Sequence, residues 1–246
     1  MLPGGPGGLR PEAYLRSGDV LGVDGARQIQ QAFQSYESTG GVGSLSSLEV
    51  FGPESGLTPS AKTLSFVTNH DSERNTADFL SYKDGPTYVL AHQWLLAQGY
   101  GSPQVYSSFT WEKAEDSPPA RADGRITDAV CGQGWSCDHR NPGIVAMVGW
   151  HDYVGQAERA NFWTDDANVV AFSKGNRGWV ALNNGKAPEE IRVQTGLPGG
   201  RYCDVITGAE QAGGCTGTVV SVNSTGFAAV TVPAKGVVAI TRASRR

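Results

Sequence analysis

The stretch Lys62–Arg74, KTLSFVTNHDSER, joins an apolar run directly to a cluster of polar side chains. Residues 63–68 are mostly β-branched or aromatic, and a nearly continuous run of this kind is typical of a parallel strand buried on both faces. In barrels of alternating strands and helices, the residues at the C-terminal ends of the strands face the active site. His70 and Asp71 are therefore the first candidates for function. An equally good interpretation is that Asp71 or Ser72 only caps a following helix.

The composition limits the class of protein and of partner. With 246 residues, of which 39% are hydrophobic and 18% charged, the chain can bury a substantial core as one large domain or two smaller ones. The net charge of -4 and the pI near 5.6 provide no basic surface for nucleic acid. A mean hydropathy of -0.29 and the lack of a long apolar run exclude a membrane span. We expect a small or neutral partner.

The N-terminal residues 1–13 contain glycine and proline where a folded element would need side chains that pack. We expect this segment to be irregular. It also lacks the positively charged start and the apolar stretch of about 7 to 15 residues that define a secretory leader. The chain is therefore expected to carry no signal peptide.

The first half of the chain alternates between strand and helix patterns. A weak strand at Asp19–Val23 precedes a helix at Gly25–Tyr36, whose apolar residues recur three and four apart. After the central strand, the pattern predicts a buried helix at Thr87–Gln98 and a further strand at Gln104–Phe109. Strand, helix and strand in this order form a right-handed parallel crossover, so residues 62–109 should form adjacent strands of an α/β sheet.

The second half has a different pattern. A short helix is expected at Ile144–Trp150, although Pro142 and Gly143 leave it little room to start. Short alternating segments separated by turn residues then follow and predict an antiparallel β-sandwich; they are 169–173, 178–183, 191–195, 201–205, 218–222, 227–232 and 237–241. We place the domain boundary near Gln156, which gives domains at 14–156 and 157–246, and expect the sandwich to be the more autonomous part.

The cysteines fall into two close pairs, Cys131 with Cys137 and Cys203 with Cys215. Four cysteines allow three connectivities, but local pairing is favoured because the cross pairs would join two domains. Two disulfides would place the protein in an oxidising compartment, whereas free buried thiols are the less favoured alternative. A zinc site is not expected, because neither pair is a CxxC motif and His139 is the only nearby histidine.

Several longer motifs occur in an order that resembles one known family. They are SFVTNHDSER (65–74), LAHQWLLAQGYGSPQVYSSFTW (90–111), CGQGWSCDHR (131–140), NVVAFSKGNRGWVALNNG (168–185) and LPGGRYCDVITG (197–208). Together, from about Tyr14 to the end of the chain, they resemble the C-terminal half of secreted α-amylases of the animal and actinobacterial type. The resemblance implies an α/β fold: the last three strand-helix units of a (β/α)8 TIM barrel, followed by the all-β sandwich domain.

The resemblance also assigns roles to residues of the NHD motif. Asp71 matches a catalytic aspartate that binds substrate hydroxyls and stabilises the transition state, and His70 matches a histidine that hydrogen-bonds the same sugar. Asn69 matches a chloride ligand of chloride-activated members. Gln104 stands where those members have a basic second ligand. Chloride is therefore unlikely to bind here, because a buried anion would lack its compensating positive charge.

The activity implied by the resemblance is the endo-hydrolysis of α-1,4-glucosidic bonds in starch and glycogen, by a secreted enzyme that is monomeric when full length. Retaining glycosidases need a nucleophile and an acid about 5 to 5.5 Å apart. In this family both carboxylates, and the motif that contributes calcium ligands, lie on segments upstream of those matched here. We therefore expect calcium ligands outside this chain, no metal site within it, and no activity from the chain alone.

Two other interpretations remain open. The chain can be a non-catalytic carbohydrate-binding or structural remnant, in which the sandwich and the NHD loop hold glucan without cleaving it. It can also come from a glucan-transferring relative of the same fold, because water and a sugar hydroxyl compete for the same intermediate.

Overall fold

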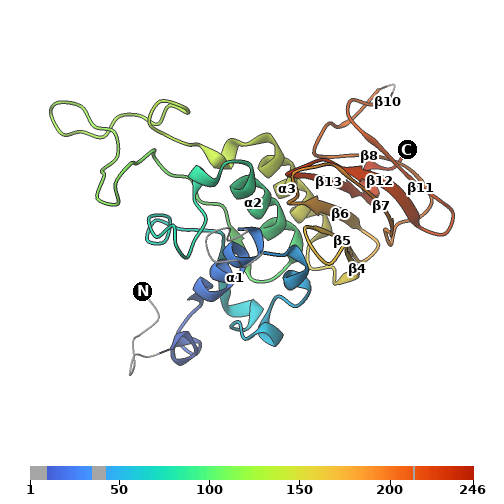
Figure 1. The fold of residues 1–246 in the computed structure, drawn as a ribbon, viewed down its shortest axis with the longest axis horizontal. Helices are drawn as coiled ribbons and strands as arrows, with labels where there is room; N and C mark the ends of the chain where they lie inside the picture. Colours follow the sequence, from blue (N-terminus) through green and yellow to red (C-terminus); the bar gives the residue numbers. More distant parts are fainter. Residues whose placement is uncertain (1–9, 35–42, 213) are drawn as a thin grey trace.

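The computed structural model describes residues 10–34, 43–212 and 214–246, and it has a helical half and an all-β half (Figure 1). The α-helices of the described part are α1 (Val23–Phe33), α2 (Pro86–Gln98) and α3 (Pro142–Val154). Within the expected irregular N-terminus, Pro11–Tyr14 forms one 3-10 turn, while residues 1–9 lie outside the described part. The predicted last helical residue Tyr36 also lies outside it.

The helical half contains a parallel sheet of three short strands, β1 (Val20–Leu21), β2 (Thr63–Phe66) and β3 (Ser102–Gln104), in the order β1-β2-β3. In the chain, α1 lies between β1 and β2, and α2 lies between β2 and β3. The predicted parallel crossover from β2 to β3 is thus confirmed. In the described residues these strands form an open sheet, so the closed TIM barrel remains an inference from the resemblance.

The strand predicted at Gln104–Phe109 is wrong in its position, because β3 occupies Ser102–Gln104. Pro103 pairs with Ser65 of β2, and in the described part β3 has no strand on its other side. A proline cannot donate a ladder hydrogen bond and is tolerated on such an edge. Beyond Gln104, the chain leaves the sheet. Tyr106 and Ser108 then contact Glu73, and Phe109 pairs with Trp135.

The helix predicted at Ile144–Trp150 is longer than expected and runs as α3 over 13 residues. Pro142 does not obstruct its start, since it occupies the first turn, where a missing N–H costs nothing. The Asn141 side chain caps this end by accepting the N–H of Gly143 at 2.9 Å. The proline is therefore a start signal for the helix.

The predicted antiparallel sandwich is confirmed. One sheet has the order β13-β6-β5-β4 and the other the order β7-β12-β11-β8. Their strands are β4 (Arg159–Thr164), β5 (Val169–Lys174), β6 (Gly178–Asn183), β7 (Glu189–Gln194), β8 (Gly200–Cys203), β11 (Val219–Val222), β12 (Phe227–Val232) and β13 (Gly236–Thr241), with a small hairpin of β9 (Glu210–Gln211) and β10 (Gly214–Cys215). Strand β4 was not predicted. Its register shifts between Ala160 and Trp163 around Asn161, whose φ is 52°, and this bulge breaks the alternation.

Strands β5, β6 and β13 of the sheet β13-β6-β5-β4 are buried on both faces. Val169, Ala171 and Trp179 belong to the core between the two sheets. Val170, Phe172 and Val180, which alternate with them, belong to a second core that also contains α2 and α3. Helix α3 ends at Val154 and β4 starts at Arg159, so only a short connection separates the halves. The helical half and the sandwich therefore share a hydrophobic core.

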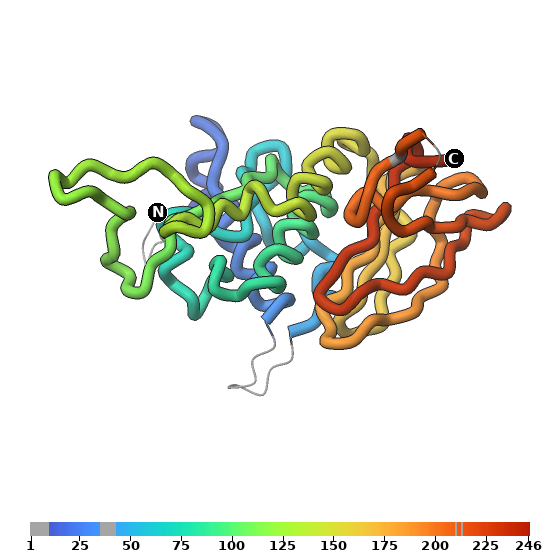
Figure 2. Tube along the Cα trace, turned by 90° about the horizontal axis from the view of Figure 1, so that it is seen from above, coloured from blue at the N-terminus to red at the C-terminus, as the bar shows by residue number. Residues whose placement is uncertain are grey.

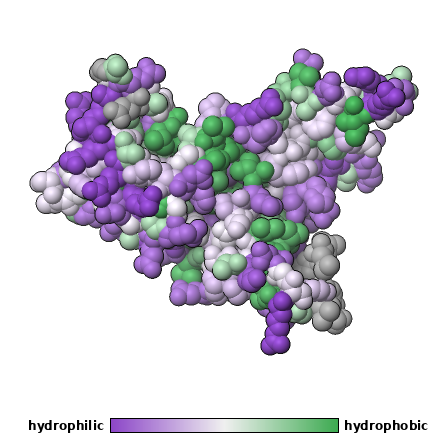
Figure 3. Space-filling model, turned by 180° about the vertical axis from the view of Figure 1, so that it is seen from behind, coloured by the Kyte–Doolittle hydropathy of each residue, from purple (hydrophilic) through white to green (hydrophobic). Residues whose placement is uncertain are grey.

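Residues 112–137 form a long loop that projects from the helical half, away from the sandwich (Figures 1 and 2). Its exposed apolar side chains include Ile126 and Val130. On the outer face of α3, Val145 and Val148 are also exposed, and Figure 3 shows apolar patches over the helical half and on the projecting loop. Among the described residues, no helix combines the length and the apolar character that a membrane crossing requires.

Candidate functional site

The NHD motif forms a turn at the C-terminal end of β2. The side-chain Oδ1 of Asn69 accepts the backbone N–H of Asp71 at 3.0 Å and that of Ser72 at 2.9 Å. Asn69 is therefore the residue whose side chain caps the N–H groups of this turn. The interpretation that Asp71 or Ser72 caps a helix is wrong. The next α-helix begins only at Pro86.

Two hydroxyl groups hold the turn to the end of the strand. Thr68 is fully buried, and its Oγ1 lies 2.9 Å from the Oγ of Ser72. The same Ser72 hydroxyl accepts the backbone N–H of Asn69 at 2.9 Å. The backbone closes the turn as well, because the N–H of Glu73 donates to the carbonyl of Asn69 at 3.0 Å.

His70 and Asp71 are the residues of this turn whose side chains project into solvent. The His70 side chain is 77% exposed and the Asp71 side chain 65% exposed. Their Nε2 and Oδ1 atoms lie 3.5 Å apart. The turn thus presents a carboxylate and an imidazole together, at the end of β2 where the sequence placed them.

Glu73 was not singled out by the sequence analysis, because it looks like one more polar residue of the motif. It is only 2% exposed. Its Oε1 accepts the hydroxyl of Ser108 at 2.7 Å and that of Tyr106 at 3.1 Å, and it lies 3.5 Å from the Nε of Arg74. The signal in the sequence that could have identified Glu73 is its position directly before an arginine, at the end of a buried strand.

Arg74 extends the contact from this turn to the loop that follows β3. Its guanidinium lies 4.8 Å from the ring centre of Phe109 and 5.2 Å from that of Trp111, within the range of cation–π attraction. It also donates to the carbonyls of Ala114 and Asp116. The start of the projecting loop is therefore held against the NHD turn.

The disulfides pair as predicted, Cys131 with Cys137 and Cys203 with Cys215. The first one closes a loop that contains Ser136. The Ser136 hydroxyl donates to the carbonyl of Ser108 at 2.8 Å and accepts the N–H of Ser108 at 3.2 Å. Ser108 is the residue that donates to Glu73, so the disulfide loop is connected to the NHD turn through one residue.

A buried histidine lies beneath this region. His92 of α2 is fully buried, and its Nδ1 donates to the carbonyl of Tyr88 at 3.0 Å. Burial lowers the pKa of His92 to about 4, while the charge of Asp138 opposes this shift. His92 is therefore neutral at pH 7 and serves as a core residue.

Among the described residues, no group of three or more His, Cys, Asp and Glu side chains is placed to hold a metal ion. Of the two positions considered for chloride, Asn69 is half-buried, with its side-chain oxygen accepting two N–H groups, and Gln104 is exposed; the expectation that chloride does not bind stays a prediction.

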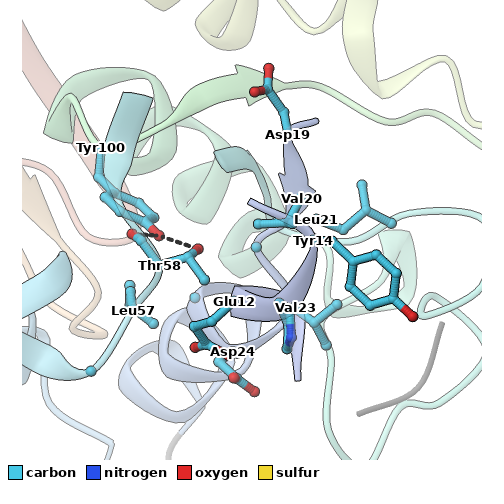
Figure 4. Close-up of a pocket in the computed structure, with 14 residues that line it drawn as sticks. Glu12, Tyr14, Asp19, Val20, Leu21, Val23, Asp24, Leu57, Thr58 and Tyr100 are labelled. Atoms are coloured by element: carbon cyan, nitrogen blue, oxygen red, sulfur yellow. Dashed lines mark hydrogen bonds between the residues drawn. The ribbon is translucent and has the colours of Figure 1, made fainter. Parts of the chain in front are cut away.

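A cavity of about 290 Å³ lies elsewhere, lined by residues that precede β2 and β3 and by β1 itself. Glu12 and Asp24 are among its lining residues, and Figure 4 shows Tyr100 beside Thr58. The Tyr100 hydroxyl is already bonded to the Thr58 carbonyl at 2.8 Å. His70 and Asp71 do not line this cavity, and we do not place the functional site there.

Comparison with known proteins gives consistent results. Residues 163–243 match the family of α-amylase C-terminal all-beta domains. An alpha-amylase-related protein of Drosophila sechellia is 38% identical over 222 residues, which make up 88% of this chain and 44% of that protein. The corresponding protein of Drosophila varians is 36% identical over the same shares of the two chains.

Two solved structures are similar over almost the whole chain. Wild-type α-amylase I from Eisenia fetida has a TM-score of 0.88 and 27% identity, covering 98% of this chain and 52% of that one. A mutant of the same enzyme in complex with maltohexaose has a TM-score of 0.85 and 28% identity, with 97% and 52% covered. This chain thus spans about half the length of the relatives it matches.

Proposed function

Since this chain is similar over nearly its whole length to the C-terminal half of α-amylases, we propose that its NHD turn binds α-1,4-linked glucan, with Asp71 and His70 as the residues that contact sugar. In the full-length protein, this turn contributes to the endo-hydrolysis of starch and glycogen by a retaining mechanism. The crystallised relative in complex with maltohexaose supports an α-glucan as the ligand class.

The observation that carries the proposal is that different residues of the turn have different roles. Asn69 and Ser72 are engaged in internal hydrogen bonds, while the side chains of His70 and Asp71 are left exposed 3.5 Å apart. A carboxylate can accept hydrogen bonds from two neighbouring sugar hydroxyls, and a neighbouring imidazole adds a third polar contact. Charge-assisted hydrogen bonds of this kind are stronger than those between neutral groups.

Asp71 by itself does not complete a glycosidase site. Its hydrogen bonds and charge can grow stronger as the sugar becomes oxocarbenium-like, but a nucleophile and an acid must still carry the reaction. Glu73, the nearest carboxylate along the chain, is buried and committed to Ser108 and Tyr106. We propose that the chain alone binds glucan without hydrolysing it.

Two further proposals follow from the disulfides and from the donor groups. Two disulfides support an extracellular location, because they persist in oxidising compartments. Calcium, if the full-length protein binds it, is held by groups other than those described here, and no step of the chemistry above depends on it. The full-length protein is proposed to act as a monomer.

The proposal is tested with Asp71→Asn, which keeps the shape of the side chain and removes its charge. We expect maltohexaose to bind the chain in titration calorimetry and to bind the variant at least ten times more weakly. In a full-length enzyme with upstream segments restored, the same change should lower turnover a hundredfold or more, about 3 kcal/mol of barrier.

The matched control is Asp123→Asn, which alters an exposed carboxylate on the projecting loop and should leave binding unchanged. Equal affinity of the wild type and Asp71→Asn would show that the NHD turn is not the glucan site. Release of reducing sugar from starch by the purified chain alone would show that further catalytic carboxylates are present.

A further inference from the structure

We propose that Glu73 is a positioning residue, which holds the NHD turn in the conformation that presents His70 and Asp71 to glucan. This inference rests on the proposed function, because it specifies how the same site is kept in place. Glu73 itself is buried and does not reach the sugar.

The turn is held at both ends, and Glu73 provides the second anchor. In the first anchor, Asn69 and Ser72 bond to each other across His70 and Asp71, and Ser72 also bonds to Thr68, two residues after β2. At the other end, the Glu73 carboxylate takes two hydroxyl donors, from Ser108 at 2.7 Å and from Tyr106 at 3.1 Å. His70 and Asp71 lie within the segment that Asn69 and Ser72 close, and Glu73 fixes the point from which that segment continues, so their position depends on both anchors.

The charge of Glu73 serves the same purpose through Arg74. The carboxylate lies 3.5 Å from the Arg74 Nε, whose side chain is 16% exposed. The guanidinium lies over the rings of Phe109 and Trp111 and donates to two loop carbonyls. Removing Glu73 would leave two hydroxyls without their acceptor and a mostly buried cation without its counter-charge, a costly state.

The network continues from Glu73 to the disulfide loop. Ser108 makes the shorter of the two hydrogen bonds to Glu73. Its backbone N–H donates to the Ser136 hydroxyl, and its carbonyl accepts from the same hydroxyl. Ser136 lies inside the loop closed by Cys131 and Cys137. Glu73 therefore ties the exposed turn to a covalently closed loop, although the two are more than 50 residues apart in sequence.

The test compares Glu73→Ala, which removes the acceptor, with Glu73→Gln, which keeps its size and one acceptor oxygen. We expect Glu73→Ala to weaken maltohexaose binding at least tenfold, and Glu73→Gln, which keeps the acceptor but loses the charge beside Arg74, to weaken it less than Glu73→Ala does. The matched control is Glu115→Ala, which removes an exposed carboxylate of the projecting loop. It should bind glucan as the wild type does.

A double-mutant cycle separates positioning from general destabilisation. If Glu73 acts through His70 and Asp71, then Glu73→Ala should weaken binding by a smaller factor in an Asp71→Asn background than in the wild type, because one of the two contacts it supports is already lost. Equal losses in both backgrounds would overturn the proposal. So would an unchanged affinity of Glu73→Ala in the wild-type background.

A measurement without glucan keeps this proposal separate from the proposed function. Amide hydrogen exchange of Asp71 and Ser72, whose N–H groups bond to Asn69, should be at least tenfold faster in Glu73→Ala and less accelerated in Glu73→Gln. If maltohexaose does not bind the wild type, the proposed function fails. In that case, the exchange rates alone decide whether Glu73 holds the turn, and unchanged rates in Glu73→Ala would overturn it.

Discussion

His92 shows how one residue can make the stability of the chain depend on pH. It is fully buried on α2, where its Nδ1–H donates a hydrogen bond to the Tyr88 carbonyl and Asp138 is the nearby charge. Burial lowers its pKa to about 4 in the folded chain, against an unfolded value near 6.5. Between these two values the unfolded chain binds more protons, so acid favours unfolding.

We expect the stability contributed by neutral His92 to be complete above pH 6.5 and to be lost as the pH falls toward 4. At pH 4.5 the loss should be about 2–3 kcal/mol. The variant His92→Gln has no imidazole to protonate. Between pH 7 and pH 4.5, its free energy of unfolding should therefore fall by about 2–3 kcal/mol less than that of the wild type. Urea denaturation at both pH values measures it. His139→Gln, at an exposed position, serves as the control, and an identical pH dependence in His92→Gln would contradict the assignment.

At the scale of elements, helix α3 is the main contact between the helical half and the sandwich. Its Trp150 is buried, and the indole N–H donates to the carbonyl of Ile240 in β13 at 3.0 Å. Gly178, the first residue of β6, packs directly beneath this helix. A Cβ at Gly178 would lie 2.6 Å from Val154 and 3.0 Å from the Trp150 ring.

We therefore expect Gly178→Ala to lower the free energy of unfolding by about 1–3 kcal/mol, because the buried Trp150 ring cannot move without losing its hydrogen bond. The matched change is Gly149→Ala on the open side of α3, where a Cβ meets nothing within 4 Å. That variant should be neutral or more stable by up to about 1 kcal/mol, because alanine favours the helix. Chemical denaturation of both variants checks the pair. A Gly178→Ala protein as stable as the wild type would show that Val154 and Trp150 can move to accommodate the added methyl group without cost.

At the scale of the whole molecule, the shared core argues against the expected autonomy of the sandwich. The outer face of its sheet β13-β6-β5-β4 packs on α2 and α3, and it would be exposed if residues 157–246 were cut free. The side chains exposed in this way are Val170, Phe172, Val180, Leu182, Val237 and Ala239. An apolar surface of this size leads to association.

We expect residues 157–246 expressed alone to aggregate, whereas the full chain should unfold in one transition seen equally by tryptophan fluorescence and by far-UV circular dichroism. Limited proteolysis of the full chain should cut first within the exposed loop 112–130 and spare the connection 155–158. A soluble, cooperatively folded 157–246 fragment would show that the sandwich is independent of α2 and α3.

Local pattern alone was enough to predict much of this chain. The alternation of apolar and polar residues marked the strands of the sandwich, and the apolar run ending in NHD placed His70 and Asp71 at the end of a strand, because these features depend on neighbours in sequence. The short separation of each cysteine pair was also sufficient, since Cys131 and Cys137 can meet within one loop. The periodicity of α1 and the apolar run of α2 belong to the same class of local signals.

Other features were decided only by tertiary structure. Strand β3 stops at Gln104, although the alternating pattern continues to Phe109, because those side chains find partners in the loop around Ser136 instead of in a sheet. The burial of Glu73 likewise depends on Tyr106 and Ser108, which no local pattern places beside it. The sequence determined which residues the NHD turn exposes, while contacts between segments far apart in the chain determined what holds that turn in place.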